Sequence, residues 1–161
     1  MQMQPKAKKT PFFYFVRDIY NSINNCNDNK NKRSYVAWTN LRKFCYGSKP
    51  RVSLLDSIQN TIDENFNVLL EEIKIFSLDI VVFVTGPSYD KYLKKQLKDI
   101  EFLEMDNHDK RGFAKIKSTD LDSIGVKYAF RLYHPKYLYL HKLSNRFINS
   151  IKMDYYRDNP K

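Results

Sequence analysis

The longest regular run of apolar positions lies in the middle of the chain. Between residues 55 and 76, large apolar side chains recur every three or four residues, at Leu55, Ile58, Ile62, Phe66, Leu69, Ile73 and Phe76. An α-helix places residues at this spacing on one face. The pattern therefore predicts one long amphipathic helix that packs this face against a core.

Similar spacing predicts three more helices. Thr10 can cap a helix that has Pro11 at its first position, where the missing N–H of proline costs nothing. Ser88 can cap a second helix over residues 89–97, and a third helix closes the chain. Their apolar stripes are Phe12, Val16, Ile19, Tyr20 and Ile23; Tyr89, Tyr92, Leu93 and Leu97; and Leu140, Leu143, Phe147 and Ile151.

Runs of β-branched and aromatic residues predict three strands between these helices. Residues 80–84 (IVVFV) are apolar throughout, which is typical of a strand covered on both faces in a parallel sheet. Residues 35–39 (YVAWT) and 126–132 (VKYAFRL) have the composition of strands as well. The last of these ends just before Pro135, because proline cannot continue a central strand.

Two shorter strands are predicted at residues 101–105 and 113–117, around a polar loop. His108 in that loop is expected to be solvated, and His141 to lie on the exposed side of the closing helix. The aromatic residues 12–15 could stack on nucleic-acid bases, but on one face of a helix such residues more often belong to the core.

The order strand, helix, strand, helix, strand, helix predicts an α/β fold with a parallel sheet and right-handed crossovers. The chain has 161 residues, which suits one domain. We expect this domain to span residues 11–155, after a basic and flexible N-terminal segment of residues 1–10.

The net charge of the chain indicates what kind of molecule it binds. The chain has 28 Lys and Arg residues against 18 Asp and Glu, a net charge of +10. Such a surplus favours a polyanion, and nucleic acid above all, because cationic side chains displace the counterions of phosphates. A basic surface that only water covers is the alternative.

Composition excludes several other classes of protein. No apolar stretch approaches the roughly 18–20 residues of a membrane helix, and no signal peptide is evident, so an intracellular, cytoplasmic protein is expected. Cys26 and Cys45 form no CxxC pair, which predicts free thiols and neither a disulfide framework nor a zinc site. Without a GxGxxG or GxxxxGK[ST] motif, no cofactor is expected, and a nucleotide-binding α/β domain is the weaker alternative.

Three polar or turn-forming residues follow predicted strands. Asn40 comes after the first strand, Gly86 after the second and His134 after the last. If these strands are parallel neighbours, the three residues lie along the carboxyl edge of the sheet, where α/β proteins bind ligands. Taken singly, each is more typical of an ordinary turn than of a binding site.

The three segments resemble successive motifs of the uracil-DNA glycosylase superfamily. They are residues 38–43 (WTNLRK), 82–89 (VFVTGPSY) and 133–138 (YHPKYL), and the resemblance extends over residues 35–151. It implies a three-layer α/β/α sandwich with a mainly parallel central sheet. It also implies DNA binding, with hydrolysis of an N-glycosidic bond in base-excision repair.

The resemblance also implies a role for each matching residue. Asn40 would read the edge of the base, His134 would stabilise the departing base, and Leu138 would be the wedge that fills the gap in the DNA. Gly86, Ser88 and Lys136 would bind backbone phosphate. The chemistry is coherent, because a base must leave the stack before it is read, and negative charge develops on it as the bond breaks.

One motif of that family is missing. Its members carry an early strand-end motif with an acidic or polar residue that positions water, and neither Asp18, on a predicted helix, nor Asp28, in an asparagine-rich loop, resembles it. In addition, Lys136 and Tyr137 stand where the family motif often has Ser and Pro. We therefore expect a fold that lacks its first strand, whose unpaired sheet edge invites self-association. A glycosylase and a non-catalytic nucleic-acid-binding module both remain open.

Overall fold

The computed structural model describes residues 10–24, 36–41, 56–65, 68–105 and 108–159. Its centre is a four-stranded sheet in the order β1-β4-β3-β2. The strands are β1 (Ile80–Phe83), β2 (Glu101–Glu104), β3 (Phe113–Lys117) and β4 (Tyr128–Leu132). The helices are α1 (Pro11–Asn24), α2 (Asp56–Asn65), α3 (Val68–Phe76), α4 (Asp90–Gln96), α5 (Thr119–Ser123), α6 (Pro135–Leu140) and α7 (Ser144–Asp158), with a 3-10 turn η1 (Pro87–Tyr89) before α4.

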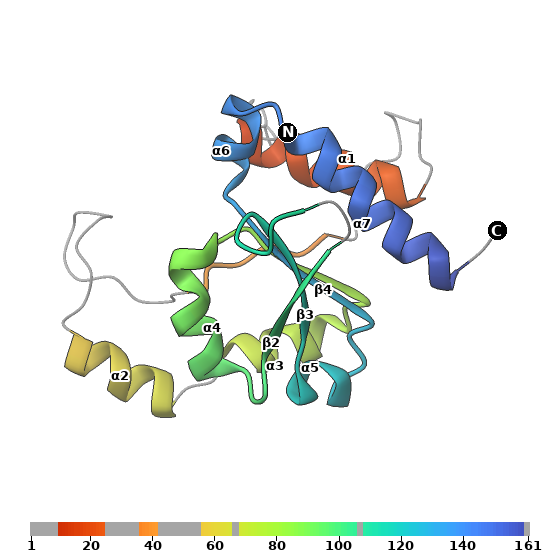
Figure 1. The fold of residues 1–161 in the computed structure, drawn as a ribbon. Coiled ribbons are helices and arrows are strands. Elements are labelled where there is room, and N and C mark those ends of the chain that lie inside the picture. Colours follow the sequence, from red (N-terminus) through yellow and green to blue (C-terminus); the bar gives the residue numbers. More distant parts are fainter. Residues whose placement is uncertain (1–9, 25–35, 42–55, 66–67, 106–107, 160–161) are drawn as a thin grey trace, which may run out of the picture.

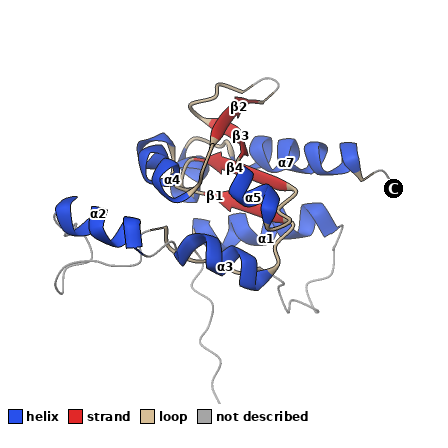
Figure 2. Cartoon of the chain, turned by 90° about the horizontal axis from the view of Figure 1, so that it is seen from below, coloured by secondary structure: helices blue, strands red, loops and turns tan. Residues whose placement is uncertain are grey.

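Helices cover both faces of the sheet, so the fold is α/β with three layers (Figure 1). On one face, Phe15 of α1, Leu138 of α6 and Phe147 of α7 pack against Phe130 of β4. On the other face, side chains of α3, α4 and α5 form a second core with the sheet. Helix α2 lies to the side of the sheet in both views (Figure 2).

The sheet is mixed, so the prediction of a mainly parallel sheet is wrong for the described strands. Strand β1 is parallel to β4, with Val82 beside Phe130, whereas β3 is antiparallel to both β2 and β4. A short loop suffices to connect antiparallel neighbours such as β2 and β3, whereas parallel neighbours need a crossover. Composition predicted these strands but not their direction.

Three sequence predictions of elements need correction. Residues 36–40 form no strand, and Tyr35 lies outside the described residues. The long helix over 55–76 is two helices, α2 and α3, on either side of residues 66–67, which the structure does not describe. The start of the closing stripe, Leu140, belongs to α6 instead of α7.

A backbone turn separates α6 from α7. Lys142 has a positive φ of 55°, and the N–H of Leu143 donates to the carbonyl of Leu138 at 2.8 Å. A left-handed residue followed by a backward hydrogen bond is the common way to end a helix. The apolar stripe continues through this turn, which is why periodicity alone merged the two helices.

Of the remaining expectations about the fold, the start of α1 is confirmed, and several others concern residues that the structure does not describe. Helix α1 begins at Pro11, as predicted. No helix in the described ranges is long and apolar enough to cross a membrane. Cys26, Cys45, Asp28 and the N-terminal segment 1–9 lie outside the described residues.

Candidate functional site

The carboxyl ends of β1 and β4 meet, as the strand order predicted for this pair. The N–H of Gly86 donates to the carbonyl of Leu132 at 2.9 Å. Gly86 has a φ of +71°, and a Cβ there would lie 3.1 Å from the Tyr133 ring. Only glycine combines this backbone conformation with so close an approach. The turn after β1 therefore packs directly beside the residue that precedes His134.

His134 caps helix α6. Its Nδ1 accepts a hydrogen bond from the backbone N–H of Lys136 at 3.1 Å, and Pro135 occupies the first helical position. An imidazole nitrogen that accepts a hydrogen bond carries no proton, so the neutral ring has its proton on Nε2 and presents a donor there. The side chain is exposed. The cap and a ligand contact are compatible, because they use different nitrogens.

Four rings from three distant segments gather beside this cap, and we call them the aromatic cluster: Phe12, Phe13, Trp38 and His134. The Phe12 ring is stacked on His134 with 6.4 Å between centroids, and it meets Trp38 edge-on at 6.1 Å. Phe13 meets Trp38 at 6.3 Å. Trp38 is 63% exposed and Phe13 42%. The cluster is thus an open aromatic surface at the carboxyl edge of the sheet.

Segment 36–41, which contains the predicted strand end at Asn40, contacts this edge through one residue, only partly as predicted. Segment 36–41 contacts the cluster through Trp38, but Asn40 is exposed and makes no hydrogen bond with any residue that the structure describes. Ser88 lies in the turn η1 and is exposed, as is Lys136 in the first turn of α6. Segment 36–41 is connected to His134 through the rings of Trp38 and Phe12, and not through the amide of Asn40 as predicted.

Leu138 is not a wedge in this structure. Its side chain is fully buried in the core formed by Phe15, Phe130 and Phe147. Pro135 and the histidine cap start helix α6, which turns Leu138 inward. To enter DNA, the side chain would have to leave the core.

Sequence reasoning missed a buried ion pair behind the same edge. Arg131 of β4 is 2% exposed, and its Nε lies 3.1 Å from Oδ1 of Asp90, at an angle too bent for a hydrogen bond. Its other nitrogens donate to the carbonyls of Arg111 at 2.6 Å and Lys110 at 2.9 Å. Burial raises the pKa of Asp90, and the Arg131 charge opposes that rise. Arg131 therefore connects β4 to α4 through the ion pair, and to the β2–β3 loop through the two hydrogen bonds.

His108 is buried, so the prediction that it is solvated is wrong. Its ring lies 5.0 Å from the rings of both Phe113 and Phe147. Its Nε2 is 2.6 Å from the hydroxyl of Ser150, and that hydroxyl donates to the carbonyl of Arg146 at 3.2 Å. The hydroxyl has one proton, so His108 donates to Ser150 when that proton goes to Arg146 and accepts from Ser150 when it does not. His141 is exposed, as expected, but at the end of α6.

The buried His108 predicts an acid-sensitive stability. Burial, with a smaller effect of the Arg146 charge, lowers the pKa of His108 below its ordinary value. The unfolded chain then binds more protons as pH falls below about 6.5, and the folded state loses stability by at most about 1.4 kcal/mol per pH unit. We expect this loss to be absent in a His108→Gln variant. Urea denaturation at several pH values below neutrality checks it.

In that comparison the other titrating groups are common to both chains. Asp90, whose raised pKa acts in the opposite direction at lower pH, contributes equally to both. Parallel pH dependence in the two chains would show that His108 titrates normally.

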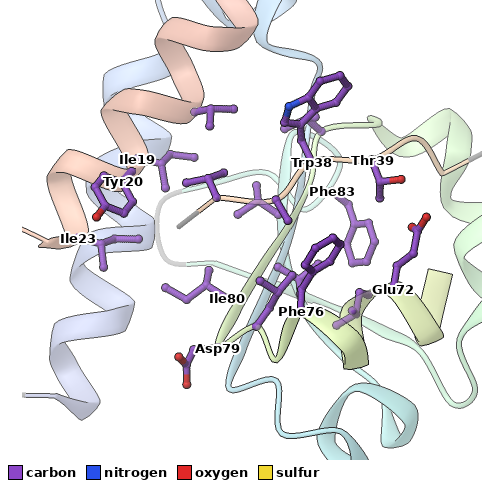
Figure 3. A pocket seen from close by; sticks show the side chains of 18 of the residues that line it. Ile19, Tyr20, Ile23, Trp38, Thr39, Glu72, Phe76, Asp79, Ile80 and Phe83 are labelled. Carbon is purple, nitrogen blue, oxygen red and sulfur yellow. The ribbon is translucent and has the colours of Figure 1, made fainter. Parts of the chain in front are cut away.

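A pocket of about 640 Å³ opens next to the aromatic cluster (Figure 3). It lies between α1, α3, strand β1 and segment 36–41, and Phe12 and Trp38 belong to its lining as well as to the cluster. Most of its lining is apolar, with Ile19 and Ile23 on one side and Phe76 on the other. No group of three or more potential metal-ligating side chains occurs among the described residues.

Comparisons with known proteins add no relative. No protein-family model, curated protein or solved structure matches the chain. The likeness to uracil-DNA glycosylases therefore depends on the three motifs alone.

Proposed function

We propose that this protein binds nucleic acid as a non-catalytic module, with unstacked bases lying on the aromatic cluster. The observation that supports the proposal is the exposure of Trp38 and Phe13 beside the His134 ring. Aromatic rings stack on any base, and each such contact contributes about 1–3 kcal/mol to binding. A single strand, or a base displaced from a duplex, is the form that can reach them.

Charge along the chain supports the same partner. Lys8 and Lys9 precede α1, and Arg42 and Lys43 follow segment 36–41, so basic residues flank two of the cluster's segments in sequence. Their placement lies outside the described residues. Lys136 follows His134 by two residues and is exposed. Cations next to stacking rings can hold the phosphates on either side of a stacked base.

Glycosylase activity is the second candidate, and His134 is the observation that favours it. The Nε2–H of this ring can donate to a base oxygen on which negative charge develops. Two observations favour binding without cleavage. The predicted wedge, Leu138, is buried, and Asp90, the acid nearest in sequence to the Gly86 turn, is engaged by Arg131.

A tryptophan titration tests the proposal directly, because Trp38 is the only tryptophan in the chain. We expect single-stranded oligonucleotides to quench its fluorescence, and salt to weaken the binding. A Trp38→Ala variant, followed by anisotropy of a labelled oligonucleotide, should bind about 5- to 100-fold more weakly because one stacking contact is lost. Phe76→Ala is the matched control, since Phe76 is 54% exposed but lies before the amino end of β1.

Three outcomes separate the alternatives. If Trp38→Ala and the wild type bind the oligonucleotide with equal affinity, the binding surface is not the aromatic cluster. Absence of binding at low salt would overturn the nucleic-acid proposal altogether. Release of uracil from uracil-containing strands, lost in a His134→Ala variant, would replace the non-catalytic proposal with the glycosylase.

A further inference from the structure

The loop between β2 and β3 ends in a tight turn, residues 109–112 (DKRG), which we call the basic turn. It leads directly into β3, whose first residue pairs with the last residue of β4. A Cβ at Gly112 would lie 3.9 Å from Cε2 of Tyr133, and the opposite edge of the same ring lies next to Gly86. The basic turn and the Gly86 turn are therefore at the same end of the sheet, on either side of one tyrosine.

Hydrogen bonds fix the backbone of the basic turn. The carbonyl of Asp109 accepts from the N–H of Gly112 at 2.9 Å, and its carboxylate accepts from the N–H of Arg111 at 3.0 Å. The buried guanidinium of Arg131 donates to the carbonyls of Lys110 and Arg111. Because its backbone is already ordered, the turn loses little conformational entropy when it binds a ligand.

The basic turn presents two adjacent cations to solvent. Lys110 and Arg111 are exposed, and neither forms an ion pair with any residue that the structure describes. Asp109 is the only acid in the turn, and its carboxylate accepts from a backbone N–H instead. An arginine can bind two oxygens of one phosphate at once, and a lysine acts as a point charge. Together they form a surface suited to phosphate.

Tyr133 and His134 connect the basic turn to the aromatic cluster. These residues are consecutive, so their Cα atoms are about 3.8 Å apart. The Tyr133 ring lies next to Gly112 of the turn, whereas the His134 ring is stacked with Phe12 of the cluster. Known single-strand binding domains cover about 4–16 nucleotides, so one strand can reach both surfaces.

We propose that the basic turn binds the phosphates of the same nucleic-acid strand whose bases stack on the aromatic cluster. This inference rests on the proposed function and extends it, because the strand passes from Trp38 across the start of α6 to Lys110 and Arg111. Arg131 is a positioning residue, which holds the turn from inside the fold without touching the strand. Phosphate contacts carry no sequence information, so this part of the site accepts any sequence.

An acidic segment of a protein is the other polyanion that two adjacent cations could bind. The rings beside them favour nucleic acid. Trp38 and Phe13 are exposed and can stack on bases, and a run of Asp and Glu side chains has no group that stacks in this way. The acidic polypeptide is therefore an outcome that the test must distinguish.

The double variant Lys110→Gln with Arg111→Gln tests the proposal in the full chain. The probe is a labelled oligothymidylate of about 16 nucleotides, followed by anisotropy. We expect affinity to fall about 5-fold or more at about 0.1 M salt. The slope of log K against log salt should decrease by about 1.4, because each phosphate contact on a single strand contributes about 0.7. Stacking releases few counterions, so Trp38→Ala should weaken binding at a nearly unchanged slope.

Lys74→Gln with Lys117→Gln is the matched control. It removes the same charge from two exposed side chains at the other end of the sheet, in the last turn of α3 and at the end of β3. Salt screens charges beyond about 10 Å at 0.1 M, so affinity should change less than about 2-fold. None of the four replaced side chains is buried, so both double variants should fold like the wild type.

Three results would overturn the proposal. Unchanged affinity and salt slope in Lys110→Gln with Arg111→Gln, beside weaker binding of Trp38→Ala, would do so and leave the proposed function intact. Equal losses in the two double variants would trace the effect to net charge instead of the turn. Polyglutamate that binds as tightly as the oligonucleotide, and is weakened equally by the Lys110 and Arg111 changes, would assign the turn to an acidic polypeptide.

Discussion

Replacing Arg131 with methionine is expected to destabilise the protein by about 3–5 kcal/mol, because it leaves the Asp90 carboxylate without its buried partner. The change also removes the donors to the carbonyls of Lys110 and Arg111, which Arg131 holds at 2.6–2.9 Å. Methionine fills most of the space, so packing contributes little to the loss. Equilibrium urea denaturation, with circular dichroism as the signal, measures it.

Two controls identify the cause of this loss. Lys127→Met breaks the exposed ion pair with Asp79 and should have little measurable effect. The double variant Arg131→Met with Asp90→Asn should recover part of the stability, because no charge is left unpaired. If the double variant is no more stable than Arg131→Met alone, the two lost hydrogen bonds, rather than the ion pair, account for the effect.

Leu138→Ala is expected to cost about 2–5 kcal/mol of unfolding free energy while leaving nucleic-acid affinity unchanged. The side chain is fully buried among Phe15, Phe130 and Phe147, so its removal leaves a cavity between α6 and the sheet. A wedge would behave in the opposite way, with affinity falling and stability hardly changing. Urea denaturation and oligonucleotide anisotropy at a temperature where the variant is folded measure both quantities.

Leu140→Ala is the matched control for Leu138. Leu140 lies in the same short helix but is 66% exposed, so its removal should change stability by less than about 0.5 kcal/mol. A large loss of affinity in Leu138→Ala at unchanged stability would restore the wedge, and would require α6 to unfold when DNA binds.

The local sequence predicted a helix or strand correctly where its residue pattern is compatible with only one kind of secondary structure. The β-branched run at residues 80–84 contains β1, and the pair Thr10-Pro11 marks the start of α1. Neighbouring helices were harder to separate. The apolar stripe through Leu140 and Leu143 spans the turn at Lys142, because both helices bury the same side.

The sequence indicated the sheet edge at which Gly86 and His134 meet, but not the aromatic residues that lie beside them. The sequence placed Gly86 and His134 at one edge, and their strands do meet there. The rings that join segment 36–41 to His134 belong to Phe12 and Trp38, and residues 12–15 were expected in the core. Phe15 is indeed buried, whereas Phe13 is exposed. No local pattern links residues that lie about a hundred positions apart, so stacking between α1 and the α6 cap could not be read from sequence.

The sequence by itself determined the α/β class, most strand positions, the basic surplus and the turn at Gly86, because these follow from composition and local backbone rules. Only the tertiary structure decided the direction of β3, the burial of His108, Arg131 and Leu138, and the place of β1 at the end of the described sheet. Those properties depend on which segments pack together. The free energy of a histidine, an arginine or a strand edge changes with what covers it, and what covers each of them comes from elsewhere in the chain.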